Sequence, residues 1–228
     1  MKNLLITATA FALCSLFHAH AEGDAVLDTK LEAAIEAGDI KTVTAMIDAD
    51  PALVKKIGFS GVTALHLAQE QTEIAKLLIE RGADVNAPSL FSGPPLHRAI
   101  KAGNVELASY LLENGADIDG KDADGITVMH CLAWVKIQAK AERLYKLIEA
   151  KKPGMLESPG EFGYTPLWMC VDRINMPVTM LLLYQGANAN IAPEGLGSSA
   201  ADLLKKRIAE EPELKQELQA LGTVLLKQ

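Results

Sequence analysis

The sequence predicts an all-α fold, a solenoid of about six stacked helix-turn-helix units, from three observations. A short motif of the form Thr-x-Leu-His recurs, with its Leu-type residue at positions 31, 65, 96, 129, 167 and 201 of the 228 residues. Apolar residues follow each copy at the spacing of an amphipathic helix. Hydrophobic residues make up 49% of the chain but aromatic residues only 5%, which favours a closely packed aliphatic core between helices.

Residues 1–21 are predicted to be a signal peptide. A mostly apolar run covers residues 4–17, which is shorter than the roughly 20 apolar residues that cross a bilayer as a helix. Small residues follow at Ala19 and Ala21, as a cleavage site requires. The alternatives are a buried first helix and a lipoprotein site at Cys14, although the bulky Leu13 before Cys14 argues against the second.

Cleavage after Ala21 would leave residues 22–228 as one domain, and we expect it in a bacterial periplasm with no membrane insertion. The formal charge is −7 for the full chain, and it becomes −8 without the leader because one Lys is lost and no acidic residue is. An acidic domain is a poor partner for nucleic acid or for an anionic membrane surface. We expect a monomer when the protein is free.

The repeated motif divides the domain into units of similar length. The four strong copies read Thr-Ala-Leu-His, Pro-Pro-Leu-His, Thr-Val-Met-His and Thr-Pro-Leu-Trp, and weaker copies lie at 29–32 and 199–202. A second signature, Gly-Ala-Asp or Gly-Ala-Asn, begins at Gly82, Gly115 and Gly186. The units are expected near residues 28–58, 59–89, 90–122, 123–159, 160–193 and 194–228, the last being a cap.

This pattern resembles the ankyrin repeat family, whose unit of about 33 residues begins Thr-Pro-Leu-His-x-Ala. The resemblance runs from about Thr29 to Gln228, nearly the whole mature chain. It implies a curved solenoid in which each unit buries its apolar face against its neighbours. It also implies a protein-binding function, exercised through the turns and the inner helices.

The motif threonines and histidines and the glycines of the second signature are predicted to have structural roles in the repeat. A hydroxyl at the start of a motif can cap a helix N-terminus, Pro166 suits a first helical position, and a glycine ends each second helix in a left-handed conformation. The resemblance implies that the motif histidines stiffen adjoining turns with hydrogen bonds. The residues concerned are Thr63, Thr127, Thr165, His66, His97, His130, Gly82, Gly115 and Gly186.

The units differ in length and polarity. The second lacks about three residues between its helices, whereas the fourth is long and ends in Lys151-Lys152-Pro153-Gly154 in place of the Gly-Ala-Asp turn. The first unit carries Glu32, Glu36 and Asp39, and the last carries several charges, so both are expected to be polar caps.

The sequence offers little support for a catalytic site, so we expect a non-enzymatic protein with no cofactor and no metal. Stacked helices lie about 8–10 Å apart, too far for three motif histidines to reach one zinc ion. No spare histidine could activate a serine or cysteine nucleophile. A Cys131–Cys170 disulfide is a weaker expectation than two buried thiols, because stacked helices usually exceed the required Cα separation.

Carboxylates in the turn between the third and fourth units could suggest a glycosidase pair, namely Asp117 with Asp119 and Asp122 with Asp124. Asp is also favoured in turns for backbone reasons, which is the interpretation we prefer. No glycine-rich phosphate loop follows a strand.

The resemblance places partner-binding residues in the turn before each first helix and at the exposed end of that helix. Carried over by their offset from the Leu-type residue, these positions include Ser60, Val62, Glu70, Gln71, Gly93, Ala102 and Val135. The candidates chosen at the remaining positions are Phe91, Lys101, Asp124, Ile126, Trp134, Phe162, Tyr164, Asp172 and Arg173. Four of them are aromatic in a chain poor in aromatic residues, and interface hot spots favour Trp, Tyr and Arg. Alternatively, Trp134 fills a gap in the long fourth unit and Phe162 packs on a neighbouring turn.

These features predict a periplasmic protein-binding module. Our first hypothesis is an inhibitor or self-protection protein that occludes a basic enzyme, such as a peptidoglycan hydrolase or endopeptidase, since opposite charges would steer the two together. The alternative is an accessory factor that supports an oxidative-stress enzyme such as catalase. An enzyme in its own right is the third and weakest hypothesis.

Overall fold

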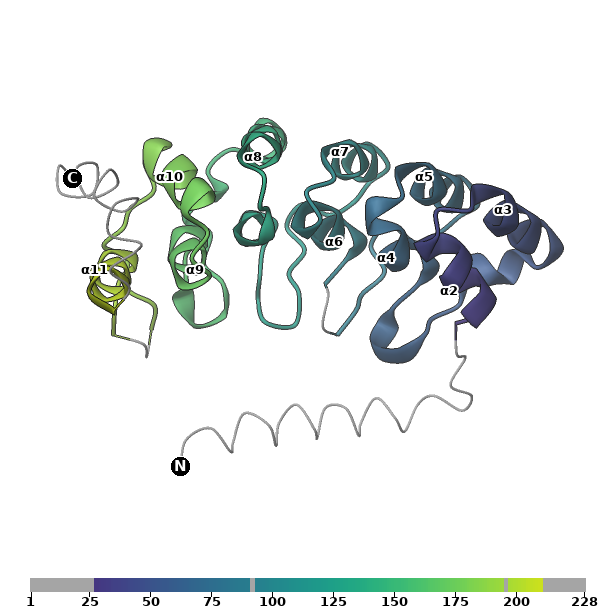
Figure 1. Ribbon diagram of the computed structural model, residues 1–228, viewed down its shortest axis with the longest axis horizontal. Helices are drawn as coiled ribbons and strands as arrows, with labels where there is room; N and C mark the ends of the chain where they lie inside the picture. The colour runs from purple at the N-terminus through teal and green to yellow at the C-terminus, as the bar shows by residue number, and fades with distance from the viewer. Residues whose placement is uncertain (1–26, 91–92, 195–196, 211–228) are drawn as a thin grey trace, which may run out of the picture.

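The computed structural model describes residues 27–90, 93–194 and 197–210, which form a solenoid of two rows of helices (Figure 1). The inner row, on the side of the long turns, consists of α2 (Thr29–Glu36), α4 (Ala64–Leu67), α6 (Pro95–Lys101), η4 (His130–Trp134), α9 (Pro166–Asp172) and α11 (Ala200–Glu210). The outer row consists of α3 (Ile40–Ala49), α5 (Thr72–Glu80), α7 (Val105–Glu113), α8 (Gln138–Lys151) and α10 (Met176–Tyr184).

Short 3-10 turns connect the rows and form the tips of two of the projecting turns. They are η1 (Pro51–Lys55), η2 (Phe59–Gly61), η3 (Ala68–Glu70), η5 (Met155–Glu157) and η6 (Glu161–Gly163). Among the described residues there is no strand, only an isolated bridge between Ile57 and Thr63. No described helix is both long and apolar enough to cross a membrane. The all-α solenoid is therefore confirmed, while the proposed leader at 1–21 lies outside the described residues.

The core runs continuously between the two rows. The Leu-type residues of the middle motifs, Leu65, Leu96, Met129 and Leu167, are all at most 1% exposed. One cluster of buried aliphatic side chains extends from Leu31 to Leu204. The scarcity of aromatic residues reflects this packing, because small and branched aliphatic side chains let the helices approach closely.

The fourth unit departs from the expected helix-turn-helix form. Its first helix is the single 3-10 turn η4, whereas its second, α8, is the longest in the described chain. The amide of Asn175, from the next unit, donates to the carbonyls of Ala133 and Val135 at 3.0 and 2.9 Å. Those carbonyls are thus bound by a neighbouring side chain and not by the N–H groups of a continuing helix, which explains the early end of η4.

Buried histidine rings link the third and fourth units to the turns of the units that follow them. In His130, Nδ1 accepts from the Thr127 backbone N–H at 3.3 Å, so the ring proton lies on Nε2 and is donated to the Tyr164 carbonyl at 2.9 Å. His97 Nε2 donates to the Ile126 carbonyl, also at 2.9 Å. His66 accepts locally from the Thr63 N–H in the same way, but its Nε2 has no hydrogen-bond partner among the described residues.

The fifth unit continues this series with a different ring. Trp168 occupies the histidine position and donates its indole N–H to the Ser198 carbonyl at 3.1 Å. The backbone N–H of Trp168 donates to the Thr165 hydroxyl, which caps the helix. The Thr127 hydroxyl, by contrast, hydrogen-bonds to the His130 ring and does not cap the helix directly. In the last described unit, Asp202 bonds with Ser199, which closes the series with a local cap.

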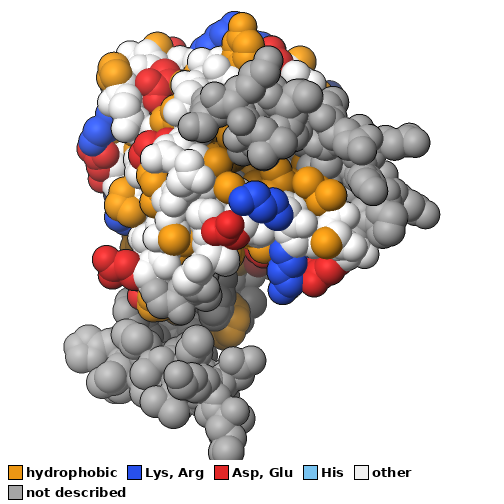
Figure 2. All heavy atoms as spheres, turned by 90° about the vertical axis from the view of Figure 1, so that its left-hand side faces the viewer, with side chains coloured by type: hydrophobic (Ala, Val, Ile, Leu, Met, Phe, Trp, Pro, Cys, Tyr) orange, Lys and Arg blue, Asp and Glu red, His pale blue; other side chains and the backbone are white. Residues whose placement is uncertain are grey.

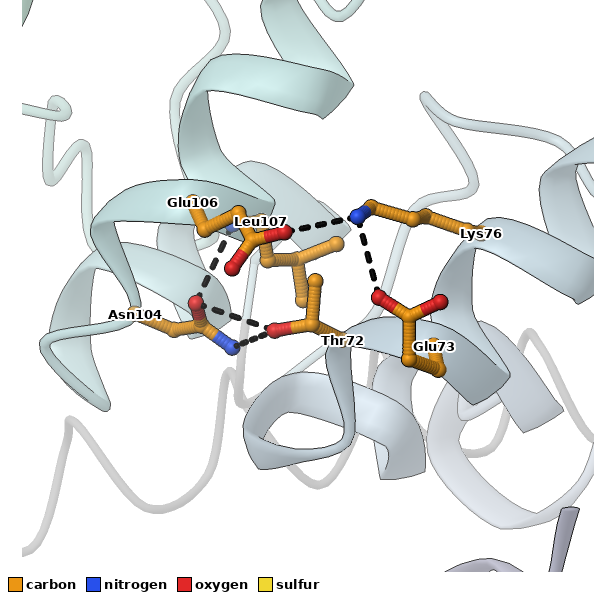
Figure 3. Close-up of polar contacts among 6 residues, drawn as sticks. All are labelled: Thr72, Glu73, Lys76, Asn104, Glu106 and Leu107. Atoms are coloured by element: carbon orange, nitrogen blue, oxygen red, sulfur yellow. Dashed lines mark hydrogen bonds and ion pairs between the residues drawn. The ribbon is translucent and has the colours of Figure 1, made fainter.

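The outer row has its own polar links between units (Figure 3). Asn104 caps α7 by accepting from the Leu107 N–H at 3.0 Å, and its amide donates to the Thr72 hydroxyl of the preceding unit at 2.9 Å. Lys76 donates to Glu73 on its own helix and to Glu106 on the next at 3.0 and 2.6 Å. Helices α5 and α7 are therefore joined by side chains as well as by core packing.

Buried histidines predict a loss of stability in mild acid. Burial lowers the pKa of His66 and of His130 to about 4, below the ordinary 6.5. Above pH 6.5 the rings are neutral in both folded and unfolded chains, but as the pH falls from 6.5 towards 4 the unfolded chain binds protons that the folded chain excludes. We expect the free energy of unfolding to fall by on the order of 1–2 kcal/mol per histidine between pH 7 and pH 5.

Denaturant unfolding at the two pH values measures this loss. His130→Gln keeps a donor for the Tyr164 carbonyl but cannot titrate, so its loss between the two pH values should be smaller than that of the parent chain. An equal loss in both would contradict the assignment.

Pro94 predicts a stabilising substitution. His97 Nδ1 is buried and has no hydrogen-bond partner among the described residues, because Pro94 lacks the N–H that Thr63 and Thr127 supply to their histidines. Pro94→Thr would supply an N–H and a hydroxyl, so we expect the midpoint of thermal unfolding to rise, by about 1 kcal/mol in free energy. Pro94→Ala supplies only the N–H and should gain less; no gain in either variant would contradict the interpretation.

Candidate functional site

A groove of about 600 Å³ lies across the fourth and fifth units, between their turns and their inner helices. Eight of the residues that the repeat register singled out line it, namely Lys101, Asp124, Ile126, Trp134, Phe162, Tyr164, Asp172 and Arg173. They come from five separate segments of the chain, so the stacking of units is what brings them together. The ninth candidate, Phe91, lies outside the described residues.

Trp134 forms one part of the floor, with two cations over its indole ring. Arg173 lies with its guanidinium carbon 3.9 Å from the ring centroid, and Lys101 with its ammonium nitrogen 4.8 Å away. Lys101 also pairs with the Asp122 carboxylate at 3.2 Å, and only 4% of the Asp122 side chain is exposed. Asp122 further accepts from the Ile126 N–H, so this buried pair is well satisfied by hydrogen bonds.

An aromatic row forms the other part of the floor. Tyr164 stacks on Trp168 with centroids 5.2 Å apart, and Phe162 meets Tyr164 edge-on at 6.1 Å. Burial raises the pKa of the Tyr164 phenol, and the nearby carboxylates Glu161, Asp124 and Asp172 raise it further. The phenol is therefore neutral at physiological pH and is bordered by negative charge.

Close contact between adjacent turns assembles this negative border. Gly125 has a φ of +68°, and a Cβ built there would lie 2.5 Å from the backbone nitrogen of Glu161. Only glycine allows the turn of the fourth unit to approach the turn of the fifth so closely. Asp124 is thereby placed beside Glu161 at the edge of the groove.

Two apolar residues beside the groove adopt left-handed backbone conformations. Phe162 has a φ of 60° and is 58% exposed, and Ile174 has a φ of 56° and is 36% exposed. At the position of Ile174, the first and third units have Gly38 and Gly103, with φ values of 70° and 69°. A side chain there costs of order 1 kcal/mol, and such strain is concentrated at functional sites.

The side chain of Ile126 differs from the others in the predicted set. It is only 5% exposed, because its backbone is held on both sides, by Asp122 at the N–H and by His97 at the carbonyl. Ile126 therefore offers little surface and supports the groove from beneath.

Sequence reasoning missed several lining residues. They are Gln69, Arg98, Asp122, Glu161, Trp168 and Met169. For Trp168 a signal existed, since an aromatic residue replaces the motif histidine, but its stacking on Tyr164 could not be read from the register. Arg98 reaches the groove from the third unit, and its Nε donates to Gln69 at 3.1 Å.

Among the described residues, no histidine or cysteine lines the groove. The three histidines are buried in their structural hydrogen bonds. Cys131 and Cys170 are both free and buried, and burial raises the pKa of the Cys131 thiol to about 12 and raises that of Cys170 as well. In the part of the chain that the structure describes, no group of three or more His, Cys, Asp or Glu side chains is placed to hold a metal ion.

A stack of helical units with a polar and aromatic groove defines the class of repeat proteins that bind other proteins. Residues 31–122 match the family profile described as ankyrin repeats, in three copies. Residues 31–122 of the solenoid therefore consist of ankyrin repeats, and the later units continue the ring-to-carbonyl links up to Ser198. Ankyrin repeats are generally non-catalytic binding modules.

Proteins with related sequences support this assignment. The chain is similar to the ankyrin repeat protein nuc-2 of Neurospora crassa, with 27% identity over 69% of this chain and 14% of that protein. It is 37% identical to protein phosphatase 1 regulatory subunit 27 of Mus musculus over 40% of this chain and 60% of that one. It is 29% identical to the phosphocholine transferase AnkX of Legionella pneumophila over 51% of this chain.

These matches cover repeats and not whole proteins. The chain spans only 12% of AnkX and 14% of nuc-2, well below two thirds of either. The name of a transferase among the relatives therefore describes that protein and not this one.

Backbone strain at Ile174 predicts a stabilising substitution. Ile174→Gly should raise the free energy of unfolding by about 1 kcal/mol, because glycine adopts a positive φ without a steric penalty. Thermal unfolding would measure the gain. The matched control is Ile137→Gly, at an exposed isoleucine whose φ is −98°; it should give no gain. If Ile174→Gly behaves like this control, the strain argument fails.

Proposed function

We propose that the protein is a periplasmic binding module that occludes an enzyme, as an inhibitor or self-protection protein, and that the groove at the fourth and fifth units is its binding face. The observation that carries the proposal is that eight residues, selected by their position in the repeat, all line that one groove. Aromatic and arginine side chains in a concave setting are typical of interface hot spots.

The proposed compartment and target rest on sequence features. Residues 1–21 have the pattern of a cleavable leader, which supports export. The acidic charge supports a basic partner, and enzymes that act on an anionic cell wall are of this kind. The preferred target is therefore a peptidoglycan hydrolase or endopeptidase.

Removal of the indole of Trp134 tests the binding face. With Trp134→Ala we expect the dissociation constant for the partner to rise by roughly 30-fold, because a central aromatic hot spot is worth about 2 kcal/mol. Since Trp134 is half-buried, Arg173→Gln provides a second variant with less risk to folding. Tyr184→Ala is the control, because Tyr184 is an 86% exposed aromatic residue on the outer helix α10.

The partner for this measurement comes from periplasmic extract of the producing bacterium, captured on the immobilised domain 22–228. Each captured enzyme is then assayed with and without the domain. Loss of hydrolase activity on binding supports occlusion. A captured hydrolase of unchanged activity would overturn the inhibitor role, and protection of a catalase against inactivation would replace it with a supporting role. Equal binding by the Trp134→Ala, Arg173→Gln and Tyr184→Ala variants would move the binding face elsewhere.

A further inference from the structure

The basic side chains of the groove have partners within the protein, whereas the acidic side chains at its edge are more open. This difference indicates what kind of group the groove would bind. Hydrophobic, basic and acidic side chains intermingle on the end of the solenoid that carries the last units, so no single charge dominates that face (Figure 2). The groove itself is defined by its lining residues, and its charge character follows from their individual contacts.

The basic residues of the groove have partners within the protein. Lys101 pairs with the buried Asp122 and lies over Trp134. Arg173 lies over the same ring, 3.9 Å from its centroid. Arg98 donates to Gln69 and is partly withdrawn from water, which lowers its pKa. An incoming anion would have to compete with these contacts.

The acidic residues at the edge are more open. Asp124, Glu161 and Asp172 are all exposed. Within residues 27–90, 93–194 and 197–210, neither Asp124 nor Glu161 takes part in an ion pair, and Asp172 has a single distant one, to Arg207 at 3.7 Å. All three line the same groove as the rings of Tyr164 and Phe162, so they border one aromatic surface.

An exposed aromatic ring beside open carboxylates suits a long cationic side chain. The charged end of an arginine or lysine would meet the carboxylates, and its aliphatic stem or guanidinium plane would lie on the rings of Tyr164 and Phe162. Phe162 is exposed in spite of its left-handed backbone, so its ring is available to such a contact.

We propose that the groove takes a basic segment of a partner protein and that one arginine or lysine side chain inserts between Asp124, Glu161 and Asp172 and the Tyr164–Phe162 rings. This inference rests on the proposed function, since it specifies the partner group that the same groove recognises. It makes the carboxylate edge, and not the total charge of the chain, the determinant of selectivity.

Selection from a displayed library of random peptides, against the domain 22–228, tests the proposal. We expect the selected peptides to share an arginine or lysine next to apolar residues and to bind more weakly as the salt concentration rises. Asp124→Asn, Glu161→Gln and Asp172→Asn should each weaken binding by about threefold, as is usual for exposed charge pairs. Glu80→Gln, an exposed carboxylate on the outer helix α5, is the matched control and should leave binding unchanged.

The outcomes separate this inference from the function on which it rests. Peptides that lose binding on Trp134→Ala but carry no basic consensus would overturn the basic-segment inference and leave the groove as a protein-binding site. Peptides whose binding withstands both Trp134→Ala and the carboxylate substitutions, or a failure to select any peptide, would count against both. A fall of the same size with Glu80→Gln would show general electrostatics and overturn the specific role of the edge.

Discussion

The hydrogen bonds from three motif rings to the carbonyls that precede the next motifs are the constraint on which the rest of the structure depends. They connect the inner helix of one unit to the turn of the next, and they run from His97 to Ile126, from His130 to Tyr164 and from Trp168 to Ser198. Two of these acceptors, Ile126 and Tyr164, belong to residues that line the groove. The bonds that hold the units in register therefore also position the proposed binding face.

The sequence predicted the fold well because the repeat carries its own register. Once the motif copies were aligned, the offset from the Leu-type residue placed eight candidates in one groove without knowledge of any contact. It could not predict that η4 ends early, because the cause is the Asn175 amide of a different unit. It also could not predict the left-handed Phe162 and Ile174, since the residue types there disfavour the conformation that packing imposes.

The groove lies where the repeat departs most from its own pattern. Around the fourth and fifth units, the motif spacing lengthens to 38 residues, Trp168 replaces a histidine, and Ile174 replaces a glycine. The two substitutions add an aromatic and an apolar side chain in or beside the groove, while the ring-to-carbonyl link is kept. Local rules of sequence and structure are broken mainly at functional sites, and here the breaks coincide with the candidate site.

The arrangement of charge in the groove also explains how an acidic protein can be selective. Net charge acts over about a Debye length and steers any basic partner, but it does not distinguish one from another. Selectivity needs short contacts, and Arg173 already occupies the Trp134 ring, so a partner's cation must find its site elsewhere. The nearest open carboxylates lie beside Tyr164, whose ring is held against Trp168. Under the proposed mode of binding, a partner is admitted only if its basic side chain reaches that edge while its apolar neighbours cover Phe162, so two conditions must be met together.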